Sequence, residues 1–391
     1  MKLQRKWNVN IMTSLLLGML GILSSSFQST ADRMAAQFGQ PITMIGTYIS
    51  FFAAGSLISV LLGGMFADRI GKRKITAGAV ALIIIGALLI AVSRQQAETL
   101  AGLLIMGMGS GTTEVMGSAI LTDENPAHAT RWMNISQIVF CAGAVTAPVA
   151  AVWYCTMGSG TYQKIFLILA LSFCVQLIFF FWNGRGDVTP AESGSRKALH
   201  PVNLLKNREF RLYAVMIFLY IGYESIAPAY IKAFFLQTGS SEAFSAFAIS
   251  VFWFSMIAGR FIGVFMNGKE KLGIQVFSPV VVAAVCFLLF AQSPQMRIVG
   301  VVLFGFACGP VWPMLFVLSS KIFPDRIGTA YSVMMVFSTG GYMIFPFLLG
   351  SAVNNIRITF IGCAFLSITV FGLSFMSIKN TKKYEVTRQS M

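Results

Sequence analysis

Charged residues are scarce in this chain of 391 residues, because Asp, Glu, Lys and Arg together make up only 11% of it. Soluble domains carry about 25% charged residues, so a surface that faces water would lack the charge that it needs. Hydrophobic residues, by contrast, make up 56% of the chain, and 13% of the residues are aromatic. This composition argues against a soluble globular protein and favours a chain that is solvated by lipid.

The residue types that most often perform chemistry are also few. Two histidines occur, His128 and His200, and both lie in predicted loops. Most of the six cysteines fall inside apolar runs, and none has the spacing of metal ligands. We also find no nucleophile–base pair and no phosphate-binding loop. The sequence therefore predicts no catalytic residue, no metal site and no organic cofactor, and it does not predict an enzyme.

Acidic residues are outnumbered by basic ones, which gives a net charge of +15 at pH 7. A nucleic-acid-binding protein would gather its basic residues on one face. Here they sit instead in short loops between apolar runs, as they do in membrane proteins, where they set the orientation. The predicted partner is the lipid bilayer and not nucleic acid.

Twelve apolar runs follow one another along the chain, and each approaches the roughly 20 residues that a spanning helix needs. The sequence therefore predicts an all-α membrane protein with twelve transmembrane helices. The runs cover 10–30, 42–66, 74–93, 97–121, 132–154, 163–183, 210–236, 243–266, 274–291, 296–320, 327–352 and 356–378.

The basic loops predict an orientation. If the N-terminus lies inside, most of the 29 Lys and Arg residues fall on the cytoplasmic side, in the N-terminal segment, the loop at 69–74 and the polar stretch 184–207. The positive-inside rule favours this arrangement. We expect a multi-pass protein of a cell membrane with both termini in the cytoplasm.

The polar stretch divides the helices into two groups of six. We predict an N-terminal six-helix bundle at 1–183, a cytoplasmic linker at 184–207 and a C-terminal six-helix bundle at 208–391. A weak repeat relates the halves, since one shift of 198 residues places 67–72 over 265–270 and also superposes the glycines Gly107 and Gly305. Two pseudo-symmetric halves with a site at their interface are a common plan of transporters.

The clearest motif occupies 63–74 and reads Gly-Gly-Met-Phe-Ala-Asp-Arg-Ile-Gly-Lys-Arg-Lys. It resembles the loop between the second and third helices of the major facilitator superfamily, G-x-x-x-D-R-x-G-R/K-R/K. A small residue allows close helix approach, a second glycine permits a tight turn, and the acid can meet a helix N-terminus or a cation. The resemblance implies a conformational latch made by Gly64, Asp68, Arg69, Gly71 and Arg73.

Two acids lie inside apolar runs, Glu114 in the fourth and Glu224 in the seventh. A charged acid in the middle of a membrane costs at least about 2.5 kcal/mol, so such residues are usually functional. Removal from water favours the neutral form of a carboxyl group. Both residues are therefore candidates to carry a proton, and the alternative is a permanently protonated carboxyl that bonds a neighbouring helix.

Five patches are similar to the fucose/glucose–proton symporter family. They are the glycine-rich run that ends at Glu114, and the segments 134–144, 220–225, 250–260 and 309–313. This resemblance implies that Glu114 couples the proton and that the amide of Gln137 binds a sugar hydroxyl, with Asn134 from the same helix as a further candidate. Sugar sites combine amides and acids with aromatic walls. The candidates for those walls are Trp312, Tyr220, Tyr223 and Trp253, and packing inside the bundles is the alternative for each of them.

The leading hypothesis is a secondary transporter that takes up a small sugar or polyol with a proton by alternating access, as a monomer in a bacterial cytoplasmic membrane. The nearest alternative is an exporter of drugs or metabolites that is driven by proton antiport on the same fold. A non-transporting sensor on a transporter scaffold is a further alternative, although such a protein could dispense with the buried acids and the loop motif, which this chain retains.

Overall fold

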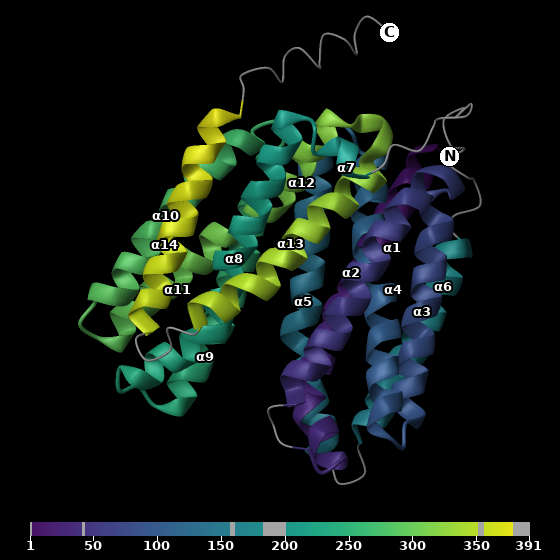
Figure 1. Cartoon of the computed structure of the whole chain (residues 1–391), viewed down its shortest axis with the longest axis horizontal. Coiled ribbons are helices and arrows are strands. Elements are labelled where there is room, and N and C mark those ends of the chain that lie inside the picture. The colour runs from purple at the N-terminus through teal and green to yellow at the C-terminus, as the bar shows by residue number, and fades with distance from the viewer. Residues whose placement is uncertain (1, 41–43, 157–160, 183–200, 351–355, 378–391) are drawn as a thin grey trace, which may run out of the picture. The chain divides into compact units, whose positions relative to one another are not determined.

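The computed structural model describes residues 2–40, 44–156, 161–182, 201–350 and 356–377. Within these ranges the regular structure is helical, without a strand (Figure 1). Each of the twelve predicted apolar runs coincides with a helix or with a pair of helices. The prediction of an all-α architecture is confirmed.

Six long helices form the first half of the chain, and most connections between them are short. A single residue, Gly71, separates the second from the third, and its φ of 103° lies in the region that favours glycine. A capping box between Gln95 and Glu98 starts the fourth helix. The helices are α1 (Lys2–Gln37), α2 (Met44–Ile70), α3 (Lys72–Val92), α4 (Gln96–Glu124), α5 (Ala129–Thr156) and α6 (Tyr162–Trp182).

The second half begins with a short helix and continues with longer ones. Polar side chains cap several of them: Asn207, Ser241 and Ser293 each accept a bond from a backbone N–H of the first turn. The helices are α7 (Pro201–Leu204), α8 (Arg208–Gln237), α9 (Glu242–Gly263), α10 (Glu270–Phe290), α11 (Pro294–Cys308), α12 (Val311–Ile322), α13 (Ile327–Gly350) and α14 (Ile356–Met376), with a 3₁₀ turn at Pro324–Arg326. Of the predicted linker, 184–200 lies outside the described residues, whereas 201–207 contains α7 and the α8 cap.

The tenth apolar run differs from its prediction as one continuous helix. It consists of α11 and α12, which are separated by Gly309 and Pro310. Neither Pro310 nor Pro313 has an N–H, so two bonds of a continuous helix cannot form here. We call Gly309–Pro310 the helix break.

The chain divides into two compact units. Unit 1 comprises 1–126, 135–199 and 327–332, and unit 2 comprises 127–134, 200–326 and 333–391. Each unit thus contains a short segment from the other half, namely the start of α5 in unit 2 and the start of α13 in unit 1. The shift of 198 residues that relates the halves places 127–134 over 325–332, so nearly equivalent segments are exchanged.

Glycines at equivalent positions allow close helix packing in each unit. In unit 1, α4 packs along α2 and α3, and a Cβ at Gly107 would collide with the Phe52 carbonyl of α2. In unit 2, α11 packs along α9 and α10, and a Cβ at Gly305 would collide with the Phe252 carbonyl of α9. Both glycines let two backbones approach more closely than side chains would permit. The repeat in the sequence therefore corresponds to a repeat in the packing.

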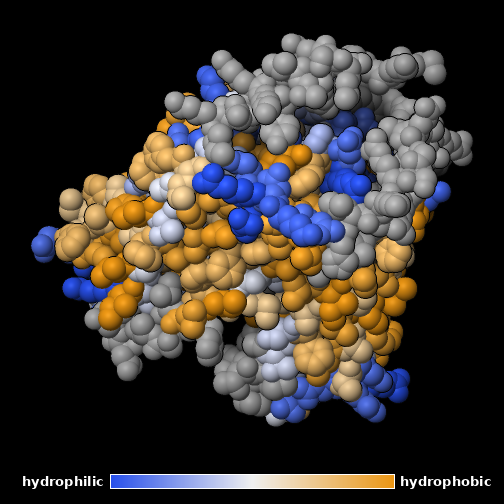
Figure 2. Space-filling model, turned by 45° about the horizontal axis from the view of Figure 1, so that its top comes forward, coloured by the Kyte–Doolittle hydropathy of each residue, from blue (hydrophilic) through white to orange (hydrophobic). Residues whose placement is uncertain are grey.

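Large apolar side chains project from the outside of both units. In unit 2, Phe254, Phe265, Phe290 and Phe365 are each at least 70% exposed, and in unit 1 Val92 is 70% and Ile178 61% exposed. Hydrophobic residues cover much of the surface visible in Figure 2. Seven helices among the described residues are long and apolar enough to cross a membrane. An apolar outer surface of this kind is suited to lipid rather than to water.

Candidate functional site

Glu114 lies on α4, immediately after the glycine-rich stretch that holds α4 against its neighbours. A Cβ at Gly109 would collide with the Ala79 carbonyl of α3, and a Cβ at Gly111 would collide with the Ser56 side chain of α2. The Glu114 side chain is half-buried, between fully buried neighbours on either side in the sequence. The glycines thus place an acid deep inside unit 1.

Buried hydroxyl groups without partners among the described residues lie on α4 itself and on α1, which packs against it. Thr13 on α1 and Ser118 on α4 each have a buried hydroxyl oxygen that finds no hydrogen-bond partner among the described residues. The two helices meet at Gly117, where a Cβ would lie 3.5 Å from the Thr13 methyl group. Buried polar groups are normally bonded, so these hydroxyls are available to a polar ligand.

The two predicted amides of α5 fall in different units. Gln137 is buried in unit 1, and Asn134 is buried in unit 2. The Asn134 Nδ2 donates to the Thr130 carbonyl at 2.9 Å, whereas its Oδ1 has no partner among the described residues. A Cβ at Gly263 would collide with the Asn134 side chain and approach Pro310. Asn134 therefore lies near the helix break of unit 2.

Glu224 is surrounded by aromatic and polar groups of unit 2. Its side chain is half-buried, and its Oε2 is buried without a partner in the described part of the chain. The carboxyl group faces the Tyr220 hydroxyl and the Arg260 guanidinium. Tyr220 and Tyr223 are fully buried, and their ring centroids lie 5.2 Å apart at a steep angle. These three predicted residues of α8 form one cluster.

The predicted tryptophans contact phenylalanines. Trp253 is half-buried, and its ring centroid lies 5.5 Å from that of Phe252. Trp312 follows the helix break and stacks on Phe316 with a centroid distance of 4.0 Å. Trp312 is 6% exposed, so the indole is packed inside unit 2.

Sequence reasoning missed Arg260 as a site residue. This cation of α9 is 5% exposed, and its Nε donates to the Gly309 carbonyl at 3.3 Å. The signal was present, because a cation inside an apolar run is as costly as an acid and marks function just as often.

The predicted latch is described in part. Gly71 makes the tight turn, and Lys72, the next residue, forms an ion pair with Asp123 at the end of α4. Arg73 is half-buried. Gly64, Asp68 and Arg69 belong to α2, but their side chains lie outside the described residues.

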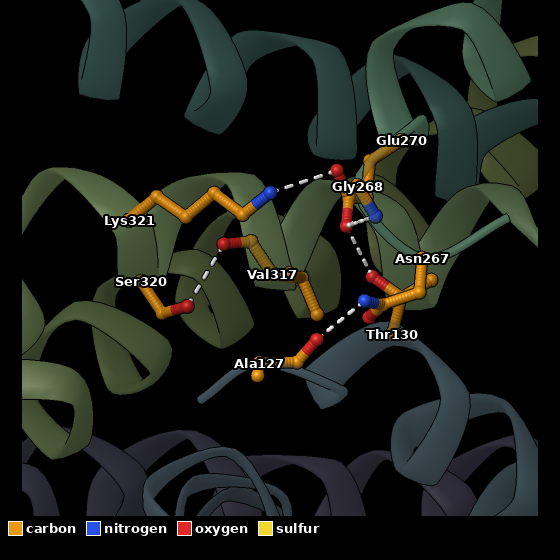
Figure 3. A network of polar contacts seen from close by, with 8 residues as sticks. All are labelled: Ala127, Thr130, Asn267, Gly268, Glu270, Val317, Ser320 and Lys321. Atoms are coloured by element: carbon orange, nitrogen blue, oxygen red, sulfur yellow. Dashed lines mark hydrogen bonds and ion pairs between the residues drawn. The ribbon is translucent and has the colours of Figure 1, made fainter. Parts of the chain in front are cut away.

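A larger polar network lies at the corresponding place in unit 2 (Figure 3). Glu270, the first residue of α10, accepts bonds from Thr130 Oγ1 at 2.5 Å, from the Gly268 backbone N–H at 2.9 Å and from Lys321 Nζ at 2.8 Å. The Asn267 side chain donates to the Ala127 carbonyl at 2.5 Å. The network joins the start of α5 to α10 and α12, and sequence reasoning did not single out Glu270 or Lys321.

Comparisons with known proteins agree with this architecture. The family model of the Major Facilitator Superfamily matches residues 11–346 and, in a second match, residues 212–390. The glucose/mannose transporter GlcP of Bacillus subtilis is 21% identical over 376 residues, which cover 93% of this chain and 92% of GlcP. The multidrug resistance protein MdtL of Escherichia coli is 25% identical over 179 residues, 46% of this chain and 45% of MdtL.

Solved structures show the same fold. The crystal structure of FucP in the outward conformation superposes with a TM-score of 0.79 at 16% identity and covers 95% of this chain and 99% of FucP. A second structure of FucP, described as the fucose:proton symporter of E. coli, gives a TM-score of 0.76 at 15% identity, over 95% of this chain and 98% of that one. At such identities the likeness establishes the architecture and not the substrate.

Proposed function

The chain belongs to the major facilitator superfamily, and we propose that it carries a sugar or a similar small polar solute across the membrane together with a proton. The observation that carries this proposal is an acid inside each unit, Glu114 in unit 1 and Glu224 in unit 2, where Glu224 has an oxygen that is buried without a partner. The match to a glucose/mannose transporter over 93% of the chain supports the sugar.

The chemistry of the buried groups suits a proton and a polyol. A neutral carboxyl group is tolerated in the membrane interior better than an anion, so a proton on either acid lowers the cost of moving that acid through a closed state. In unit 1, the Gln137 amide and the buried hydroxyls of Thr13 and Ser118 are groups of the kind that bond sugar hydroxyls, and in unit 2 the Asn134 amide is another. Aromatic side chains supply the apolar faces.

Coupling then follows from linkage. In alternating access, the two halves rock about a site that opens to one side at a time. Substrate and proton are coupled if each changes the free energy of the same conformational step. An acid next to the substrate site meets this requirement, because its charge alters both the binding of polar groups and the cost of closure.

One alternative has an observation of its own. MdtL is similar to this chain over 46% of the length, and an exporter that exchanges a drug for a proton would use the same fold and the same acids. Such an exporter binds apolar solutes and moves protons in the opposite sense. The direction of proton movement therefore separates it from a symporter.

For the setting, we propose a monomer in a bacterial cytoplasmic membrane with both termini in the cytoplasm and with the proton as the coupling ion. The excess of Lys and Arg in the loops and the polar stretch on one side supports this orientation. The bacterial origin of the sugar transporter that matches most of the chain supports the location.

Proton movement in poorly energised cells that express the protein tests the function. We would add hexoses, deoxyhexoses and polyols one at a time and record the external pH, with Glu114→Gln in parallel. We expect external alkalinisation with one sugar, lost in the variant. Silence with every sugar, together with efflux of lipophilic dyes driven by external acid, would refute symport and establish the exporter.

A further inference from the structure

The carbonyl groups at the helix break are held by side chains from two other helices. The Gly309 carbonyl lacks its usual helical donor, because the residue four positions later is Pro313, which has no N–H. Arg260 of α9 donates to it from Nε at 3.3 Å. The carbonyl of Cys308, the last residue of α11, accepts the Tyr220 hydroxyl of α8 at 2.8 Å. Both donors also face Glu224.

The Tyr220 hydroxyl has two acceptors but only one proton to donate. If Glu224 is protonated, its own O–H can donate to the Tyr220 oxygen, and Tyr220 keeps its bond to the Cys308 carbonyl. If Glu224 is ionised, it only accepts, and an anion attracts a donor more strongly than a neutral carbonyl does. Tyr220 must then turn from the Cys308 carbonyl to the carboxylate.

Ionisation of Glu224 also draws Arg260 away from the helix break and toward the carboxylate. Its bond to the Gly309 carbonyl is long, and a guanidinium pairs with a carboxylate in preference to an amide oxygen. The other groups that interact electrostatically with Glu224 are Tyr223, Cys308 and Tyr342, which are neutral in their ordinary protonation states. The negative charge of Glu224 therefore acts on Arg260 and Tyr220, the two side chains that satisfy the break.

The observed arrangement fits a neutral Glu224. Tyr220 donates to Cys308, and the Glu224 Oε2 is buried without a partner among the described residues. A carboxylate held permanently as an anion would need donors for both oxygens, since an unpaired buried charge is very costly. A protonated carboxyl group needs fewer. The site is thus arranged to accommodate a change of charge.

We propose that Tyr220 and Arg260 are positioning residues that transmit the charge of Glu224 to the helix break at Gly309–Pro310. A neutral Glu224 leaves the carbonyls of Cys308 and Gly309 bonded and the break tight, whereas an ionised Glu224 withdraws both donors and loosens it. Trp312, the second residue of α12, moves with the break. This inference deepens the proposed function, because it rests on Glu224 as a residue that gains and loses the proton.

Cys308 provides a probe at the break itself. We would replace the other five cysteines by Ala and measure the alkylation rate of Cys308 by N-ethylmaleimide in membranes, at acidic and at alkaline pH. A chain that retains only Cys141, a buried thiol of unit 1, corrects for the thiolate fraction. Glu224→Gln and Tyr220→Phe are the test variants. Tyr213→Phe is the matched control on α8, because its hydroxyl bonds Ser377 instead.

We expect the ratio of Cys308 to Cys141 alkylation to rise about fivefold with pH, the effect of one lost hydrogen bond. The rise should persist in Tyr213→Phe, become smaller in Tyr220→Phe because only Arg260 still responds to the charge, and disappear in Glu224→Gln. Tyr220→Phe should raise the ratio at every pH, because the Cys308 carbonyl has lost its donor. A ratio that does not change with pH, or a rise that keeps its full size in Glu224→Gln or in Tyr220→Phe, overturns the proposal.

The outcome for the proposed function is read separately. If sugar drives proton uptake but the ratio of Cys308 to Cys141 alkylation does not change with pH, symport is supported and the link between Glu224 and the helix break is refuted. If the alkylation ratio changes with pH but no sugar causes proton movement, the link between Glu224 and the helix break is supported and sugar–proton symport is refuted. The two failures are therefore distinguishable.

Discussion

The two units carry ion pairs at equivalent positions, but with the charges reversed. In unit 1, Lys72 at the start of α3 pairs with Asp123 in the last turn of α4. The shift of 198 residues places these positions over Glu270 at the start of α10 and Lys321 in the last turn of α12, which also form an ion pair. The duplication thus preserved the contact and exchanged its acid and its base.

The reversal changes how each charge meets its helix. A helix N-terminus favours an anion and a C-terminus favours a cation. Glu270 and Lys321 both stand at the favourable ends, whereas Lys72 and Asp123 both stand at the unfavourable ones. The acid of the unit 2 pair is also far more buried, since the Glu270 side chain is 3% exposed against 35% for Asp123, whereas the base is more exposed, at 38% for Lys321 against 18% for Lys72. We therefore expect the unit 2 pair to stabilise the fold more than the unit 1 pair does.

The largest effect is expected from Glu270→Lys. This change places a cation against Lys321 and removes the acceptor of Thr130 and of the Gly268 N–H. We expect a loss of about 3 kcal/mol in the free energy of unfolding, at the low end for a broken buried pair because Lys321 reaches solvent. Thermal unfolding in detergent measures it. A loss no greater than that of Asp123→Lys would contradict the comparison.

Exchanging both charges of a pair sharpens the contrast further, because the sign of the effect should differ between units. Lys72→Glu with Asp123→Lys moves each charge to a favourable helix end, so we expect no loss or a gain of about 1 kcal/mol. Glu270→Lys with Lys321→Glu does the reverse, and we expect a loss of about 2 kcal/mol. The same unfolding assay applies, and equal effects in both units would show that the helix ends do not matter.

Thr130→Val removes one donor to Glu270 and leaves the charges in place. A hydrogen bond to a charged group contributes about 1.5 kcal/mol, and we expect a loss of that size. Thr369→Val is the control, because that hydroxyl is exposed and bonds only its own helix. The difference should vanish when both threonine changes are compared in a Glu270→Ala background, where the Thr130 hydroxyl has lost its acceptor.

The smallest effect belongs to Lys72→Met. The pair with Asp123 is partly exposed and opposed by both helix ends, so its loss should cost about 0.5 kcal/mol or less. Added salt should reduce even this difference, since exposed pairs are screened. A loss in the free energy of unfolding near that of Glu270→Lys would show that the unit 1 pair stabilises the fold as much as the unit 2 pair does.

Much of this architecture could be predicted because lipid requires each spanning segment to be apolar and to satisfy its own backbone hydrogen bonds. Most of the apolar runs became helices within a few residues of their predicted ends, although α1 extends seven to eight residues beyond both ends of its run and the tenth run became two helices. The repeat was visible in Gly107 and Gly305 because close backbone approach requires glycine on each side of the duplication. The acids Glu114 and Glu224 could be identified from the sequence because a charged side chain in the membrane interior is energetically costly.

Other features depend on partners that are distant in the sequence. Glu270 and Lys321 each look like an ordinary charge at a helix end, and only their pairing across 51 residues and the added bond from Thr130 reveal a network. Arg260 is visible as a buried cation, but its bond to the Gly309 carbonyl depends on how α9 packs against α11.

The sequence by itself determined the twelve apolar segments, the twofold repeat and the two acids inside the apolar runs, because burial in lipid penalises every polar group that is not internally bonded. Tertiary structure alone decided which donors satisfy the helix break and which acid pairs with which base. The reason is physical: a hydrogen bond needs a partner within about 3 Å, and only the packing of helices from separate parts of the chain brings Tyr220 and Arg260 that close to the carbonyls of Cys308 and Gly309.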